Sequence, residues 1–145
     1  MSFELYVISR TNDLTKAKSD LMAFFKRRRG YKKYRFQYGF SAGRHNEEFL
    51  IGFPDPDSDQ EIEAEVEDPA NTIAWISINF FRSAAHYRAA ANELQALLDT
   101  GKFTLYDPQE DEHFASSFPR ADFVAWMSGI ELNDLENANL IPPER

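Results

Sequence analysis

The chain of 145 residues contains no cysteine, only six glycines and only three histidines. Without cysteine, disulfide frameworks, thiolate nucleophiles and cysteine-ligated zinc sites are excluded. No apolar run approaches the roughly twenty residues that a membrane-spanning helix needs. The N-terminal residues also lack the basic lead and long apolar run of a signal peptide. We therefore expect a soluble, cytoplasmic protein that does not contact membranes.

The histidines give no indication of a metal or cofactor. His45, His86 and His113 are far apart and form none of the short-spaced pairs that ligate metals. We predict no cofactor and no catalytic residues. A small enzyme with a site assembled from Arg44, His45 or His113 is retained as a second alternative function.

Apolar residues are abundant and suit one packed domain. Hydrophobic residues make up 43% of the chain and aromatic residues 14%, including thirteen phenylalanines. This composition and length predict a single domain over residues 1–145. Residues 130–145 read as an acidic C-terminal extension of that domain.

Periodicity predicts six strands and three helices. Strands are expected at residues 3–8, 34–40, 49–53, 62–66, 72–81 and 103–106, where apolar residues alternate or run together. Helices are expected from Asn12 or Asp13 to Gly30, from Ser83 to Gly101 and from Ser117 to Gly129. The segment after Tyr106 is expected to be a polar loop.

The resulting order, β-α-β-β-β-β-α-β-α, predicts an α+β fold. We expect a mostly antiparallel sheet with helices packed on one face, a sandwich related to ferredoxin-like folds. The strand at residues 72–81 is the most hydrophobic and should lie at the sheet centre. Trp75 and Trp126 are both expected to pack in the core.

Two segments match the residue types of functional motifs but lack other features that those motifs need. Gly39-Phe40-Ser41-Ala42-Gly43 fits the G-x-S-x-G nucleophile elbow, but a strand is expected after it where that mechanism needs a helix. Asp55, Asp57 and Asp59 have the spacing of a calcium loop, which also needs glycine at the sixth position and glutamate at the twelfth. Gln60 and Val66 stand there. We interpret the two segments as a hairpin turn and a solvated acidic loop.

Basic residues are concentrated between Lys16 and Arg35, which hold nine of the sixteen lysines and arginines. Arg29-Gly30-Tyr31 resembles the start of an RNA-recognition motif, but Lys32 and Lys33 break the pattern. The net charge of −8 also disfavours nucleic acid as a partner. A nucleic-acid or phospholigand binder that uses Lys26–Arg35 is therefore the alternative function.

Acidic residues form the more unusual surface. Residues 47–68 carry ten acids and no base, and a second acidic run begins at Asp107. We predict a non-enzymatic module that binds a protein with a basic surface, since complementary potential speeds such encounters. The predicted partner-binding residues are Asp55, Asp57, Asp59, Glu61, Glu63, Glu65, Asp107, Gln109, Glu110 and Asp111.

The segment from Ser83 to Gln109 resembles part of a known group of proteins. Its alanine-rich helix, Gly101, short strand and Tyr106-Asp107-Pro108-Gln109 phrase are similar to the closing segment of uncharacterised bacterial α+β families. Some of these families are similar to immunity proteins of bacterial toxin systems. The resemblance implies a small inhibitor that neutralises a partner by binding it, with no catalytic residues.

Overall fold

In a computed structural model of the protein, residues 2–34, 37–41, 51–54, 71–80, 83–129 and 134 are described. Seven strands form one sheet in which every pairing is antiparallel. The strands are β1 (Ser2–Ser9), β2 (Tyr31–Tyr34), β3 (Gln37–Phe40), β4 (Ile51–Pro54), β5 (Thr72–Asn79), β6 (Phe103–Asp107) and β7 (Glu112–Phe114). The helices are α1 (Leu14–Arg27), α2 (Ala84–Asp99) and α3 (Arg120–Ser128).

The strand order is β2-β3-β4-β5-β1-β6-β7. β5 is therefore the middle strand, as its hydrophobicity predicts. α1 connects β1 to β2 at the edge of the sheet, and this connection passes over β5, β4 and β3. α2 connects β5 to β6 and passes over β1 alone, which is the split β-α-β arrangement of ferredoxin-like folds. The predicted α+β class is confirmed.

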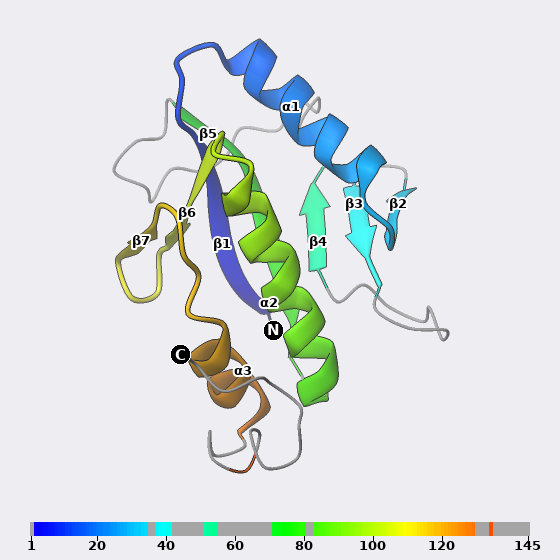
Figure 1. The fold of residues 1–145 in the computed structure, drawn as a ribbon, viewed down its shortest axis with the longest axis vertical. Coiled ribbons are helices and arrows are strands. Elements are labelled where there is room, and N and C mark those ends of the chain that lie inside the picture. Colours follow the sequence, from blue (N-terminus) through cyan, green and yellow to red (C-terminus); the bar gives the residue numbers. More distant parts are fainter. Residues whose placement is uncertain are drawn as a thin grey trace.

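The main core lies between the sheet and the helices on one of its faces (Figure 1). α1 covers the β2–β3 end of the sheet, where the Phe25 and Tyr38 rings stack with centroids 4.7 Å apart. α2 lies over the other half and buries Tyr87, whose hydroxyl donates to the carbonyl of Asn79 at 2.9 Å. Burial of aromatic and aliphatic side chains in this core stabilises the fold through the hydrophobic effect.

The third helix packs against the start of α2, at the end of the sheet where β1 begins (Figure 1). Its inward side consists of Ala121, Phe123, Val124 and Met127, all buried. No helix in the described part of the chain is long and apolar enough to cross a membrane.

The helix boundaries follow the predicted capping residues. Asp13 caps α1 by accepting a hydrogen bond from the Lys16 amide, and Ser83 caps α2 through the His86 amide. Gly129 ends α3 in the left-handed conformation, with φ of 70°. α1 ends at Arg27, three residues before the predicted Gly30.

Gly30 has a different role at the turn into β2. Its φ is +96°, and a Cβ there would lie 2.6 Å from Cε2 of Phe40. The carbonyl of Gly30 also accepts a hydrogen bond from the Ser41 amide at 3.0 Å. Only glycine fits this close contact between the two strands without displacing the Phe40 ring.

Three details of the predicted strand pattern need correction or lie beyond the description. The single strand expected at residues 34–40 is wrong, because β2 and β3 are separate antiparallel strands with Tyr34 opposite Gln37. The loop expected after Tyr106 contains β7, whose residue His113 pairs with Tyr106. The strand expected at residues 62–66 lies outside the described residues.

Candidate functional site

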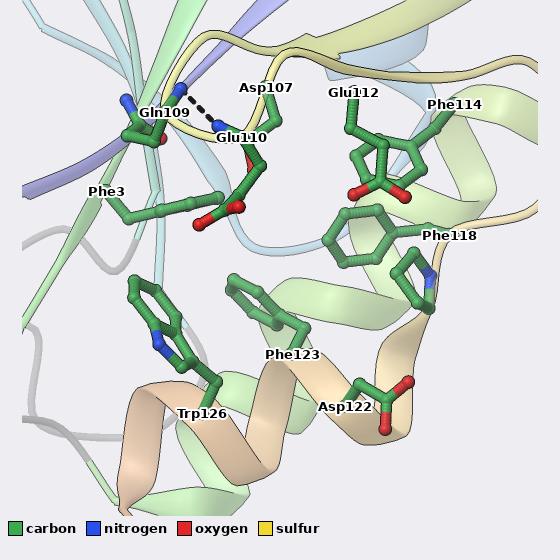
Figure 2. A pocket seen from close by; sticks show the side chains of 11 residues that line it. Phe3, Asp107, Gln109, Glu110, Glu112, Phe114, Phe118, Asp122, Phe123 and Trp126 are labelled. Carbon is green, nitrogen blue, oxygen red and sulfur yellow. Dashed lines mark hydrogen bonds between the residues drawn. The ribbon is translucent and has the colours of Figure 1, made fainter.

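A pocket of about 360 Å³ opens between the β6–β7 hairpin and α3, beside the start of β1 (Figure 2). This volume lies within the range of small-ligand sites. The fold brings the start of β1 together with two segments that follow one another more than a hundred residues later in the chain, the β6–β7 hairpin and α3 with the loop before it. The lining residues are Phe3, Asp107, Gln109, Glu110, Glu112, Phe114, Phe118, Pro119, Asp122, Phe123 and Trp126.

The floor of the pocket is aromatic and firmly packed. Phe123 contacts Phe3 with ring centroids 5.7 Å apart and Phe118 at 5.2 Å. Phe114 also packs against Phe118 at 5.2 Å. All four phenylalanines are buried, so their side chains belong to the hydrophobic core as well as to the pocket. Such a floor holds its shape without a ligand.

The loop before α3 is held in place by one glutamine. The Gln95 side chain of α2 accepts a hydrogen bond from the Phe118 amide at 2.8 Å and donates to the Ser116 carbonyl at 3.0 Å. Both bonds satisfy backbone groups that have no strand or helix partner. They position Phe118 against the hairpin.

Trp126 forms the outer wall and is the main departure from the sequence prediction. Its side chain was expected in the core, but the residue is 61% exposed. The indole contacts Phe3 edge-on at 5.5 Å and Phe80 at 6.5 Å, which leaves much of its surface open to solvent. An exposed tryptophan beside a pocket is typical of a binding surface.

Carboxylates surround this aromatic floor. Glu110 and Glu112 come from the β6–β7 hairpin and Asp122 from the first turn of α3, and all three are exposed. None of them forms an ion pair with another residue that the structure describes, and no lysine, arginine or histidine lines the pocket. Arg120, the nearest cation in sequence to Asp122, donates to Asn92 of α2 at 2.9 Å. The pocket is therefore negatively charged.

Asp107 lies deeper and shapes the hairpin turn. Its Oδ1 accepts hydrogen bonds from the Gln109 amide at 2.9 Å and the Glu110 amide at 3.4 Å. Burial raises the pKa of Asp107 above its usual value of 3.8, and the nearby charge of Glu110 acts in the same direction. The two backbone donors oppose this effect but do not cancel it.

This raised pKa predicts a pH-dependent gain of stability in Asp107→Asn. The folded protein holds the Asp107 proton more tightly than the unfolded chain, so ionisation of Asp107 destabilises the fold as the pH rises through the raised pKa. Below 3.8 this penalty is absent. Asparagine keeps the accepting oxygen and removes the charge, so we expect the variant to gain stability relative to wild type at pH 7 but not at pH 3.5.

Urea unfolding at these two pH values provides the measurement. Asp107→Ala is the matched control, because it removes both the charge and the acceptor of the turn. It should be less stable than Asp107→Asn at both pH values. An Asp107→Asn variant that is less stable than wild type at pH 7 would contradict the argument.

The structure brings together part of the predicted partner-binding set. Asp107, Gln109 and Glu110 line the pocket. Asp111 does not, because its carboxylate accepts a 2.7 Å hydrogen bond from the Tyr106 hydroxyl and its φ of 50° places it at the end of the turn. The six predicted residues between Asp55 and Glu65 lie outside the described residues.

Sequence reasoning missed the aromatic half of the site. Asp122 and Trp126 are the exposed pocket residues that were not predicted, whereas Glu112 ends the acidic run that begins at Asp107. A signal was present in α3, since Asp122 and Trp126 are four residues apart and so lie on the same side of the helix. The stripe of buried residues at Phe123 and Met127 is offset from them by one position.

Other candidate chemistries find little support in the described regions. No group of three or more histidine and acidic residues is placed there to hold a metal ion. His86 lies 2.5 Å from the Ser83 hydroxyl through Nδ1, as part of the α2 cap. His113 packs on the Tyr106 ring with centroids 4.4 Å apart.

The basic segment is partly used inside the fold. Arg28 forms a bidentate pair with Glu93 of α2, with N–O distances of 2.7 and 2.5 Å. The Lys33 ammonium lies over the Tyr38 ring at 5.6 Å. Lys26, Arg27 and Arg29 remain exposed around the end of α1, where positive charge is favoured by the helix dipole.

Comparisons with protein-family models, with curated proteins and with solved structures found no match to this chain.

Proposed function

We propose that this protein is a binding module that docks a basic protein partner at the pocket between the β6–β7 hairpin and α3. One observation carries the proposal: an aromatic floor with an exposed tryptophan is surrounded by carboxylates that have no cationic neighbour in the pocket lining. Aromatic anchors inside a charged rim are the usual arrangement of energetically important contacts in protein interfaces.

The net charge of the whole chain also favours a basic partner. A net charge of −8 attracts a basic partner from a distance and orients it before contact. The association rate should therefore fall as salt is added, whereas contacts with the aromatic floor should govern dissociation. An inhibitor of the immunity type, which neutralises its partner by occupying it, would act in this way without any catalytic residue.

The alternative function at Lys26–Arg35 has less support. Arg28 pairs with Glu93, and the Lys33 ammonium lies over the Tyr38 ring. The segment therefore does not present a continuous row of free cations. We therefore favour the acidic side of the molecule.

A charge-reversal pair tests the proposed docking site. Glu110→Lys with Glu112→Lys alters the pocket, and Asp57→Lys with Asp59→Lys alters the other predicted acidic segment by the same net charge. A basic partner is first isolated from the source cells with the wild-type protein, identified by mass spectrometry and purified. We expect the pocket variant to bind this partner at least about tenfold more weakly, since desolvated interface charges contribute more than about 1.4 kcal/mol.

The loop variant is the matched control and should retain most of the affinity. Loss of binding in the loop variant alone would transfer the interface to residues 55–65 and refute the pocket. Equal loss in both variants would indicate a response to net charge and would also contradict specific docking. Thermal unfolding of both variants verifies that each is folded.

A further inference from the structure

We infer that the pocket is a receptor for one arginine side chain, whose guanidinium group lies against the Trp126 indole and pairs with the Glu110 carboxylate. This inference rests on the proposed function and names the chemical group that the basic partner inserts. It extends a general electrostatic attraction to a specific side-chain contact.

The exposed Trp126 indole is suited to contact with a cation. Trp126 is fixed on one edge by Phe3 and Phe80, yet 61% of its surface remains exposed. A large aromatic ring that is held in place but uncovered gains from a ligand that covers it. Tryptophan is also the best aromatic partner for a cation, and a planar guanidinium stacks on its face.

The pocket carboxylates can pair with the charge of the same cation. In Figure 2 the Glu110 carboxylate points into the space between the hairpin and Trp126, while the Glu112 carboxylate lies towards the Phe114 and Phe118 side. A guanidinium between Trp126 and Glu110 would therefore have a carboxylate partner on one side and an aromatic surface on the other. Arginine presents its donors in a fork that fits a carboxylate in two-point geometry.

The aromatic floor of the pocket offers a contact surface for the apolar part of the arginine side chain. Phe118 and Phe123 form an apolar surface that suits the three methylene groups of arginine, which bury well while the charged end stays near polar groups. A metal ion would gain nothing from this surface. The described acids also contain no group of three that could hold one. An extended organic cation matches the pocket better than a compact ion does.

The free protein carries a repulsion that such a cation would relieve. Asp107, Glu110, Glu112 and Asp122 surround one pocket of about 360 Å³. The charge of Glu110 contributes to the raised pKa of Asp107, which reports that the negative charges oppose one another. A bound guanidinium would stabilise the ionised form of Asp107, so binding should weaken as the pH falls towards the acid range.

Blocked amino acids provide a direct test with ¹⁵N-labelled protein. The probes are N-acetyl-arginine N-methylamide, its lysine counterpart and its citrulline counterpart, which has a similar shape but no charge. We expect the arginine probe to shift the Trp126 indole N–H resonance in a saturable manner, with a Kd on the order of 1–10 mM. The citrulline probe should bind at least about tenfold more weakly, and the lysine probe should also be weaker than arginine.

Two variants assign the contact to the proposed groups. Trp126→Ala and Glu110→Gln should each weaken the arginine probe by about fivefold or more, measured in Trp126→Ala from the backbone amide resonances of the β6–β7 hairpin because that variant lacks the indole. Trp75→Phe serves as the control, because it removes the other indole signal and does not touch the pocket. Its affinity for the arginine probe should equal that of wild type.

The results separate the inference from the proposed function. An unshifted Trp126 resonance, equal binding of citrulline and arginine, or tighter binding of lysine would each overturn the arginine receptor. If the arginine receptor were overturned in this way but the charge-reversed pocket variant still failed to bind the protein partner, the proposed docking at the pocket would remain supported. Saturable arginine binding together with unchanged partner binding in that variant would instead refute the proposed function and leave the receptor intact.

Discussion

Phe123→Ala is expected to lower the free energy of unfolding by about 3–5 kcal/mol, the largest effect of any substitution considered for this protein. Phe123 is only 6% exposed and its ring contacts Phe3, Tyr87 and Phe118, with centroids 5.7, 6.3 and 5.2 Å away. These neighbours belong to β1, to α2 and to the loop before α3. Because they are tied to separate elements, they cannot collapse readily into the space that the ring leaves.

The same substitution should also remove the floor of the pocket. Urea unfolding followed by circular dichroism measures the stability, and the shift of the Trp126 indole resonance reports the pocket. Trp126→Ala is the matched control, since it lies in the same helix but is 61% exposed and should cost less than about 1 kcal/mol. Similar losses in the two variants would contradict the described packing of α3.

Arg28→Ala is expected to destabilise the protein by about 2 kcal/mol, the second largest effect. It leaves the Glu93 carboxylate, whose side chain is 7% exposed, without its bidentate partner. Removal of one member of a fully buried pair costs about 3–5 kcal/mol. We expect less here because the Arg28 side chain is 40% exposed and solvent screens part of the interaction. The guanidinium also lies 5.6 Å from the Phe24 ring centroid, and that contact is lost as well.

The two ends of this ion pair should respond unequally. Glu93→Ala leaves Arg28, which can turn towards water, so we expect a loss of about 1 kcal/mol or less. The double variant should resemble Glu93→Ala, because no charge is then left buried. Denaturant unfolding of the wild type, both single variants and the double variant completes the cycle. A larger loss in Glu93→Ala than in Arg28→Ala would contradict this account of the pair.

The Arg28–Glu93 ion pair joins two helices, so part of the basic segment has a structural role. The hydrogen bonds that Arg28 donates to Glu93 raise the pKa of Arg28 further above its usual value, so the guanidinium remains charged. The pair joins the end of α1 to the middle of α2. Burial, followed by the charge of Glu93, also raises the pKa of Tyr31 well above its usual value, which keeps that hydroxyl neutral beside the pair.

Local sequence signals predicted much of the secondary structure. Asp13 and Ser83 have side chains that cap a helix, and Gly129 can adopt the left-handed conformation that ends one. These properties act over a few residues and do not depend on the rest of the fold. The hydrophobicity of β5 likewise predicted its central place, because a strand covered on both edges tends to be apolar.

The same periodic signal failed where the chain reverses. Tyr34, Phe36, Tyr38 and Phe40 alternate without interruption, so a single strand over residues 34–40 satisfied the pattern. In β2 and β3, however, Tyr31 lies opposite Phe40 and Lys33 opposite Tyr38. A hairpin conserves the alternation on both strands, and no glycine or asparagine marks the turn. Only cross-strand pairing distinguishes the two possibilities.

The pocket shows the same division between local and long-range information. The acidic run after Asp107 is visible in the sequence, and Asp107, Gln109 and Glu110 were predicted to bind a partner. The exposure of Trp126 was not, because the four-residue spacing of Asp122 and Trp126 does not by itself decide which side of α3 its neighbours cover. That depends on where α2 and the start of β1 lie.

The sequence by itself determined the α+β class, most of the helix caps, the central strand and the acidic character of this protein, since each is indicated by composition or by patterns among residues close together in the chain. The tertiary structure alone decided that the β6–β7 hairpin, α3 and the start of β1 meet to form one pocket. It also decided that Trp126 stays uncovered beside carboxylates that form no ion pair with the other described residues. Both features depend on the approach of β1 to α3, which lie more than a hundred residues apart in the chain, as in the pairing of Phe3 with Phe123, and no local pattern specifies such a contact.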